Sequence, residues 1–168
     1  MRPTPINHEV PFPDNEFIVS KTDLKGKIVY GNALFIKLSG YTEEELLGAP
    51  HSILRHPDMP KAVFKLLWDT IQAGNEIFAY VKNLVKDGSY YWVEAQVTPS
   101  FDDNGTIIAY HSVRRKPSSK TINMIAQVYS QMLSIEGKSG VEASAKYLFD
   151  LLKQKGVSYD EFIFSLKS

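Results

Sequence analysis

The sequence has 168 residues, 43% of them hydrophobic, and no cysteine. This length allows one domain of ordinary size with a short appendage, and the lack of cysteine excludes disulfides, thiolate metal ligands and flavin–cysteinyl adducts. Lys and Arg together number 19, as do Asp and Glu, so the formal net charge is zero and gives no indication of a nucleic-acid partner.

Two further features of the sequence bear on where in the cell the protein lies. No apolar run approaches the ~18 residues that a membrane-spanning helix needs, and the N-terminus lacks the pattern of a signal peptide. The short basic run 114–116 is typical of a solvated strand end rather than a nucleic-acid site. We therefore expect a cytoplasmic protein that neither binds nucleic acid nor inserts into a membrane.

Proline divides the chain into three parts. Pro3, Pro5, Pro11 and Pro13 lie near the start, and no proline follows Pro117. Because proline is rare inside helices and common in extended segments, residues 1–15 are expected to form an extended arm. Residues 16–117 are then the folded domain, and residues 118–168 a helical extension.

The first half of the domain contains short elements. Gly40 is typical of a helix end, Thr42 and Glu45 form a capping box, and Pro60 suits the first turn of a longer helix. The pattern predicts strands at 16–20 and 27–30 and helices at 32–39, from 42, and from 60 to about 74.

Three longer strands follow at 76–85, 89–100 and 106–115. The tripeptides 86–88 and 103–105, each ending in glycine, are typical of tight hairpins. Two short strands, several small helices and three long antiparallel strands predict an α+β domain with helices on one face of the sheet. The extension carries three amphipathic helical patterns, whose apolar faces must pack on each other, on the sheet or on a partner.

The predicted strand from residue 76 presents different side chains on its two faces. One face is apolar except for Asn83, whose buried amide needs a partner; a structural bond to a neighbouring loop and a polar ligand are both open at this point. The other face joins the adjacent strand in an aromatic cluster of Phe78, Tyr80, Tyr90 and Trp92. Such a cluster must be covered by the extension or by a second molecule.

The densest polar segment is 51–60, just before the helix that carries Phe64 and Trp68. It holds His51, Arg55 and His56, and the planar guanidinium of arginine suits phosphate. From these residues alone, the favoured interpretation is structural: Asp58 caps the helix and Arg55 pairs with a surface carboxylate. No third ligand accompanies the two histidines at metal-site spacing, so no metal is expected. No nucleophile motif or phosphate-binding loop is present, which argues against a hydrolase or kinase.

At these residues the sequence resembles a known family. The stretch SKTDLKGKIVYGNALFIKLSGYTEEELLGAPHSILRHPDMPKAVF and the later VKNLVKDGSYYWVEAQVTPSFDDNGTIIAYHSVRRKPS are similar to the PAS domain of bacterial aerotaxis receptors. The blocks RHPDMP and VKN are the most specific. The resemblance implies a PAS fold, with a five-stranded antiparallel sheet and helices over one face enclosing a cofactor cleft, and FAD as the cofactor.

Carried over by motif, the resemblance implies a set of cofactor-binding residues: Arg55, His56 and Asp58, with Asn32, Phe64 and Asn83 lining the cleft, and His51 and Trp68 as further candidates. It also implies a non-enzymatic redox or energy-taxis sensor. The chain most resembles a stand-alone cytoplasmic PAS partner, which would dock on a separate membrane-bound chemoreceptor of the methyl-accepting type and could form a homodimer. A cofactor-free dimerisation adaptor and a haem-binding PAS sensor are the alternatives.

Overall fold

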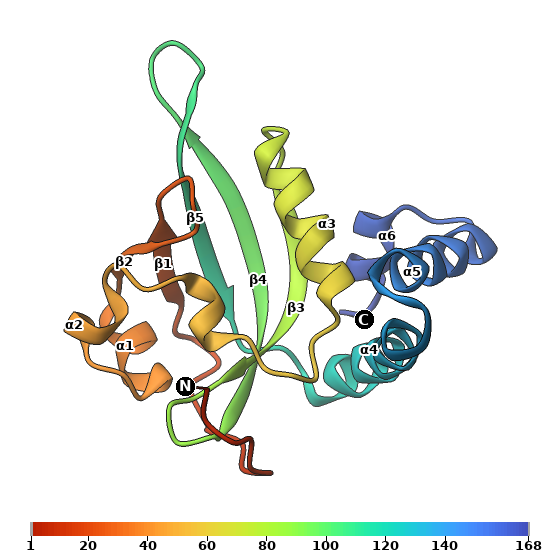
Figure 1. The fold of residues 1–168 in the computed structure, drawn as a ribbon, viewed down its shortest axis with the longest axis horizontal. Coiled ribbons are helices and arrows are strands. Elements are labelled where there is room, and N and C mark those ends of the chain that lie inside the picture. The colour runs from red at the N-terminus through yellow and green to blue at the C-terminus, as the bar shows by residue number, and fades with distance from the viewer. Residues whose placement is uncertain (1, 168) are drawn as a thin grey trace.

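Five antiparallel strands form one sheet in the computed structural model, which describes residues 2–167 (Figure 1). Their order across the sheet is β2-β1-β5-β4-β3, so the last strand in the chain lies at the centre. The strands are β1 (Ile18–Thr22), β2 (Ile28–Gly31), β3 (Ile77–Leu84), β4 (Tyr90–Phe101) and β5 (Ile107–Arg115). The predicted α+β fold with a five-stranded sheet is confirmed.

Local sequence signals fix the elements that cover the inner face. Asn32 caps α1 by accepting from the backbone N–H of Phe35, and Gly40 ends the helix with a φ of 78°. The predicted capping box of Thr42 and Glu45 opens α2. The inner elements are α1 (Ala33–Ser39), α2 (Glu43–Leu46), the 3₁₀ turn η1 (His51–Leu54) and α3 (Lys61–Gln72).

The strand register determines which side chains share the inner face. Ala95 of β4 pairs with Ala79 of β3 on one side and with Arg114 of β5 on the other, and Arg114 in turn pairs with Ile18 of β1. Because side chains alternate along a strand, this row and those two residues away point to the helices α1 to α3. Arg114 therefore faces the interior, and the expectation that residues 114–116 form a solvated strand end is wrong for Arg114, which is 3% exposed.

The extension covers the outer face beside β3 and β4. It consists of α4 (Ser119–Ser139), α5 (Val141–Lys155) and α6 (Tyr159–Ser165), gathered on the side of β3 opposite to α1 and α2 in Figure 1. Tyr80 is 1% exposed and Trp92 8% exposed beneath these helices. The sequence left open whether the extension or a second molecule covers the outer aromatic cluster. In the structure, the chain's own extension covers Phe78, Tyr80 and Trp92.

The N-terminal arm is extended but is bound to the domain. The backbone N–H of Ile6 donates to Gly88 (2.8 Å), and Tyr90 exchanges backbone hydrogen bonds with His8 and Val10. The arm therefore covers the end of the β3–β4 hairpin, including Tyr90. Residues 1 and 168, at the outer ends of the predicted arm and extension, lie outside the described residues.

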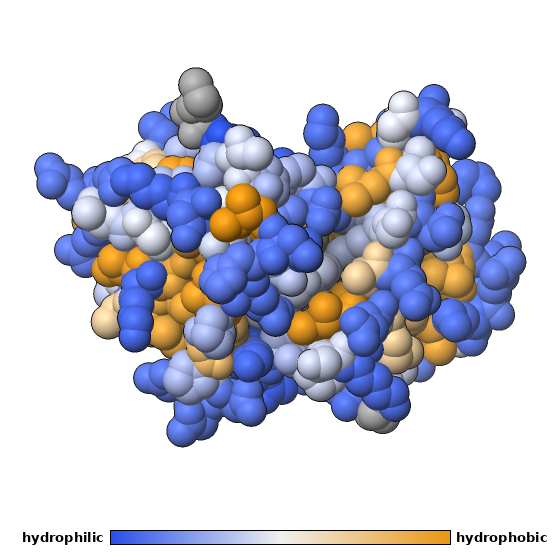
Figure 2. All heavy atoms as spheres, turned by 90° about the horizontal axis from the view of Figure 1, so that it is seen from below, coloured by the Kyte–Doolittle hydropathy of each residue, from blue (hydrophilic) through white to orange (hydrophobic). Residues whose placement is uncertain are grey.

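The surface has no continuous apolar band on the face seen in Figure 2, where separate hydrophobic patches alternate with hydrophilic side chains. Among residues 2–167, no helix combines the length and the apolar character needed to cross a membrane.

Candidate functional site

A cavity of about 360 Å³ lies between the inner face of the sheet and the elements η1 and α3. Ligand pockets span about 300–1,000 Å³, so this cavity suits one flat ring system rather than a whole dinucleotide. One wall is apolar and comes from α3, with Phe64 and Leu67. The facing wall is the sheet, which contributes Val81, Ala95 and Val97.

Trp68 closes one end of the cavity. Its ring lies edge-on to Tyr110 of β5, with 5.5 Å between ring centroids, and it packs on the turn between β1 and β2. Gly26 in that turn has a φ of 82°, and a Cβ there would lie 2.9 Å from the indole ring. Glycine is thus required at this position both by the backbone conformation and by the tryptophan.

A buried polar cluster forms part of the floor. Arg114 donates to the hydroxyl of Ser20 (2.5 Å) and to Nε2 of His51 (3.3 Å), and the Ser20 and His51 atoms are 3.0 Å apart. The guanidinium also lies 4.9 Å from the ring centroid of Phe35. The Nε of Arg114 has no hydrogen-bond partner among the described residues.

Burial controls the charges of this cluster. Burial and the adjacent Arg114 cation lower the pKa of His51 to about 3, so the imidazole is neutral at physiological pH. Burial also lowers the pKa of Arg114 to about 10, which leaves the guanidinium charged. The cluster therefore carries a single positive charge into the cavity.

Asn83 and Arg55 form a second polar group, on the β3 side. Their backbones pair in an isolated antiparallel bridge, and both side chains line the cavity. Asn83 is 3% exposed, and its Nδ2 has no partner within normal hydrogen-bond geometry in residues 2–167. A polar neighbour is the hydroxyl of Tyr91, opposite it in the ladder, which likewise has no partner within that geometry and whose pKa, raised by burial, the Asn83 amide lowers slightly. The Nε of Arg55 also has no partner among these residues. The Arg55 guanidinium stacks 4.0 Å from the ring centroid of Phe64.

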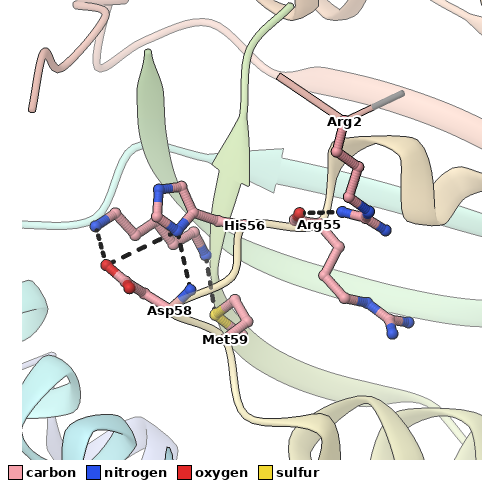
Figure 3. Close-up of polar contacts among 6 residues, drawn as sticks. Arg2, Arg55, His56, Asp58 and Met59 are labelled. Carbon is pink, nitrogen blue, oxygen red and sulfur yellow. Dashed lines mark hydrogen bonds and ion pairs between the residues drawn. The ribbon is translucent and has the colours of Figure 1, made fainter. Parts of the chain in front are cut away.

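Arg2 of the N-terminal arm adds a further cation beside Arg55. Its guanidinium donates to the backbone carbonyls of Arg55 (2.5 Å) and Ser52 (2.7 Å), as Figure 3 shows for Arg55. Burial and the nearby Arg2 charge lower the pKa of Arg55. Arg2 therefore lies beside Arg55, which lines the cavity.

The adjoining residues of the RHPDMP block form a corner around the edge of β3 (Figure 3). Nδ1 of buried His56 accepts from the backbone N–H of Asp58 (3.0 Å). The Asp58 carboxylate pairs with Lys82 (2.9 Å), and the sulfur of Met59 accepts from the Lys82 backbone N–H (3.3 Å). This corner holds the segment before α3 against the strand and so positions Arg55.

The structure divides the candidate residues into two groups. His51, Arg55, Phe64, Trp68 and Asn83 line the cavity. Three others do not line it, namely Asn32, His56 and Asp58, and their contact with a cofactor stays a prediction.

Each of these three side chains is engaged elsewhere. Asn32 accepts from the backbone N–H groups of Val19 (3.2 Å) and Phe35 (3.0 Å), and donates to the Phe17 carbonyl. His56 closes the corner described above, and Asp58 is 62% exposed on the far side of it.

Sequence reasoning missed Ser20 and Arg114 as site residues. The signal for Arg114 was its position: it follows Tyr110 and Ser112 at the two-residue spacing of one strand face, and all three line the cavity. Ser20 carried no comparable signal. Within residues 2–167, no three His, Asp or Glu side chains lie close enough to hold a metal ion.

The family described as PAS fold matches residues 28–114, which include the cavity-lining parts of α3, β3, β4 and β5. The chain belongs to the PAS family. This PAS domain is of the aerotaxis-receptor type: the chain is 38% identical over 122 residues to the aerotaxis receptor of Escherichia coli strain K12. The match covers 73% of this chain and 24% of the receptor, so the chain spans about a quarter of that relative.

Two solved PAS-type structures are also similar. A light-oxygen-voltage domain whose mechanism was studied with a flavin analogue is 28% identical, with a TM-score of 0.57, over 66% of this chain and 83% of that one. The dark structure of the light-oxygen-voltage domain of the blue-light photoreceptor Aureochrome1 is 28% identical, with a TM-score of 0.57, over 71% and 86% of the two chains.

Proposed function

We propose that this PAS module binds FAD in the cavity and senses redox or energy state in the cytoplasm. The observation that carries the proposal is the buried amide of Asn83, whose Nδ2 has no partner among the described residues and lines the cavity. An unpaired buried donor costs ~1–3 kcal/mol, which a ligand carbonyl would recover. The resemblance to aerotaxis receptors and to a domain studied with a flavin analogue supports a flavin as that ligand.

The residues present fit such a group. Phe64, Leu67 and Trp68 would cover a flat ring on one side, and Val81 and Val97 on the other. The cavity volume of about 360 Å³ is small for a dinucleotide. The remainder of FAD would therefore extend toward the rim, where planar guanidinium groups suit phosphate oxygens.

Arg55 and Arg2 are the residues that would hold a diphosphate, because neither forms an ion pair with a carboxylate among residues 2–167. A bound flavin supplies reversible electron uptake, with a change of charge and hydrogen bonding at its ring. The side chain of Asn83 would change its hydrogen bond to the ring when the ring is reduced. Its backbone would stay fixed, because β3 is paired with β4.

Strand β3 connects the cavity to the C-terminal extension. Phe78 and Tyr80 lie on the strand that carries Asn83, and their carbonyls accept from Tyr159 of α6 (2.9 Å) and Tyr129 of α4 (2.6 Å). A shift of this strand therefore acts directly on the extension. We propose that the extension transmits the signal, without enzymatic turnover, to a separate membrane-bound methyl-accepting chemoreceptor.

Purification under native conditions tests the cofactor. We expect a yellow protein with absorption bands near ~370 and ~450 nm, the general flavin spectrum, and FAD rather than FMN after release. Asn83→Ala should retain several-fold less flavin, while Asn104→Ala in the exposed β4–β5 turn should retain the wild-type amount. A colourless wild-type protein that FAD does not reconstitute would contradict the proposal in favour of an adaptor, and a Soret band would favour haem.

A further inference from the structure

Arg114 is a buried cation without a carboxylate partner. It is 3% exposed, and no ion pair joins it to an acidic side chain in residues 2–167. The adjacent Arg115, on the opposite face of the same strand, is instead paired with Glu94 (3.4 Å). The two arginines thus share a strand and a residue type but differ in burial and in charge compensation.

A buried guanidinium without a negatively charged partner destabilises the folded protein. Arg114 has five N–H donors; two of its nitrogens donate to the neutral groups of Ser20 and His51, and the Nε has no partner among the described residues. A buried charge without a counter-charge costs several kcal/mol. Because Arg114 lines the cavity, a negatively charged group bound there would compensate its charge.

We propose that Arg114, held by Ser20 and His51, is the subsite that takes up the negative charge of a reduced flavin and thereby sets the reduction potential of the sensor. This inference rests on the proposed function. When a donor of the quinol class reduces the ring, the neutral ring gains two electrons and one proton and carries one net negative charge. The quinol loses two electrons and two protons, and the second proton passes to solvent.

Arg114 is better placed for this role than Arg55 or Arg2. Arg55 is only partly buried and lies beside Arg2, where water screens its charge. Arg114 lies on the central strand at the floor of the cavity, where a charge interaction is several times stronger than at the surface. Neutral His51 accepts from Arg114 and orients it without adding a second charge.

The test compares wild type with Arg114→Gln, Arg114→Lys and Arg115→Gln, each purified natively and titrated with dithionite against a reference dye. We expect Arg114→Gln to bind reduced flavin at least tenfold more weakly relative to oxidised flavin, which lowers the midpoint potential by about 30 mV for a two-electron couple. Arg114→Lys keeps the charge and should retain most of the wild-type potential. Arg115→Gln, the matched control, should equal wild type.

Thermal unfolding with and without flavin separates this role from a structural one. Because an unpaired buried charge is removed, flavin-free Arg114→Gln should unfold at or above the wild-type temperature. A lower unfolding temperature in both forms with an unchanged potential would overturn the proposal. If Arg114→Gln does not fold, the same titration is made with Ser20→Ala. We expect this variant to have a lower midpoint potential than wild type, and an unchanged midpoint potential would overturn the proposed role of Arg114. Wild-type protein without flavin would instead overturn the proposed function, and this subsite with it.

Discussion

Arg55 and His56 are neighbours in the sequence, yet they act at different places. Arg55 lines the cavity, whereas the His56 ring turns away to accept from the backbone of Asp58. A motif transferred as a block cannot separate these roles, because successive residues in an extended segment point in opposite directions. The motif therefore predicted a segment beside the cavity, and the local backbone decides which of its side chains line that cavity.

Also at the residue scale, features that depend on a few neighbouring residues could be predicted from the sequence, whereas features that depend on distant strands could not. The Asn32 cap, the Gly40 helix end and the Thr42 capping box depend on three or four consecutive residues, and all could be predicted as element boundaries. The burial of Arg114 depends on β4 and on β1, of which β1 is remote in sequence. The basic run alone does not show which of its members turns inward; that follows from the two-residue alternation along the whole strand.

The first prediction concerns His51 and acid stability. The unfolded imidazole titrates near 6.5, whereas burial beside Arg114 lowers the folded pKa to about 3. Between these pH values the unfolded chain binds a proton that the folded protein does not, so the free energy of unfolding falls as the pH falls, by at most ~1.4 kcal/mol per pH unit. His51→Gln should show a shallower decrease in urea titrations between pH 6.5 and 4. An unchanged slope would contradict a His51 imidazole that stays neutral in the folded protein.

At the scale of elements, α3 is tied to the extension. Pro60, its N-cap, supplies no side-chain hydrogen bond. Instead, the carboxylate of Glu136 in α4 accepts from the backbone N–H groups of Lys61 (2.9 Å) and Ala62 (3.0 Å). A negative group at a helix N-terminus is stabilised by free N–H donors and by the helix dipole. The helix that lines the cavity is therefore capped by the helix that covers the outer sheet.

The second prediction tests this cap. Glu136→Gln keeps the shape but removes the charge, and should lower the free energy of unfolding by about 1–2 kcal/mol in urea denaturation. The matched control is Glu142→Gln, because Glu142 is exposed on α5, lines with Ala62 a hollow between α3 and α5, and caps no helix among residues 2–167; it should stay within about 0.5 kcal/mol of wild type. Equal effects of the two variants would show that the carboxylate does not act as a cap.

At the scale of the whole molecule, the cavity and the extension lie on opposite faces of one sheet, and two of the contacts between them involve elements that line the cavity. One such connection is β3, through the phenol groups of Tyr129 and Tyr159, and another is α3, through Glu136. Burial raises the pKa of Tyr80 to about 12, and burial also raises the pKa values of Tyr129 and Tyr159, so these phenols remain neutral donors across the physiological range. A coupling of ~1–3 kcal/mol between cavity and extension would be sufficient for signalling.

The sequence also left open what covers the outer aromatic face. Amphipathic stripes in the extension predicted three helices, and all three are present. Their apolar faces fit an outer sheet or a second chain equally well, because both are apolar surfaces of similar chemistry. Only the tertiary contact, with Trp92 stacked on Tyr129 at 6.2 Å between centroids, resolves this choice.

We expect reduction of the cofactor to change the hydrogen-exchange protection of the extension. The measurement is hydrogen exchange of the natively purified protein in the oxidised and dithionite-reduced states, followed by mass spectrometry. Exchange in α4 and α6 should change on reduction, whereas exchange in α2, which contacts neither connection, should not. The change should be lost in Asn83→Ala. Identical exchange of α4 and α6 in the two redox states of flavin-loaded wild-type protein would contradict the account.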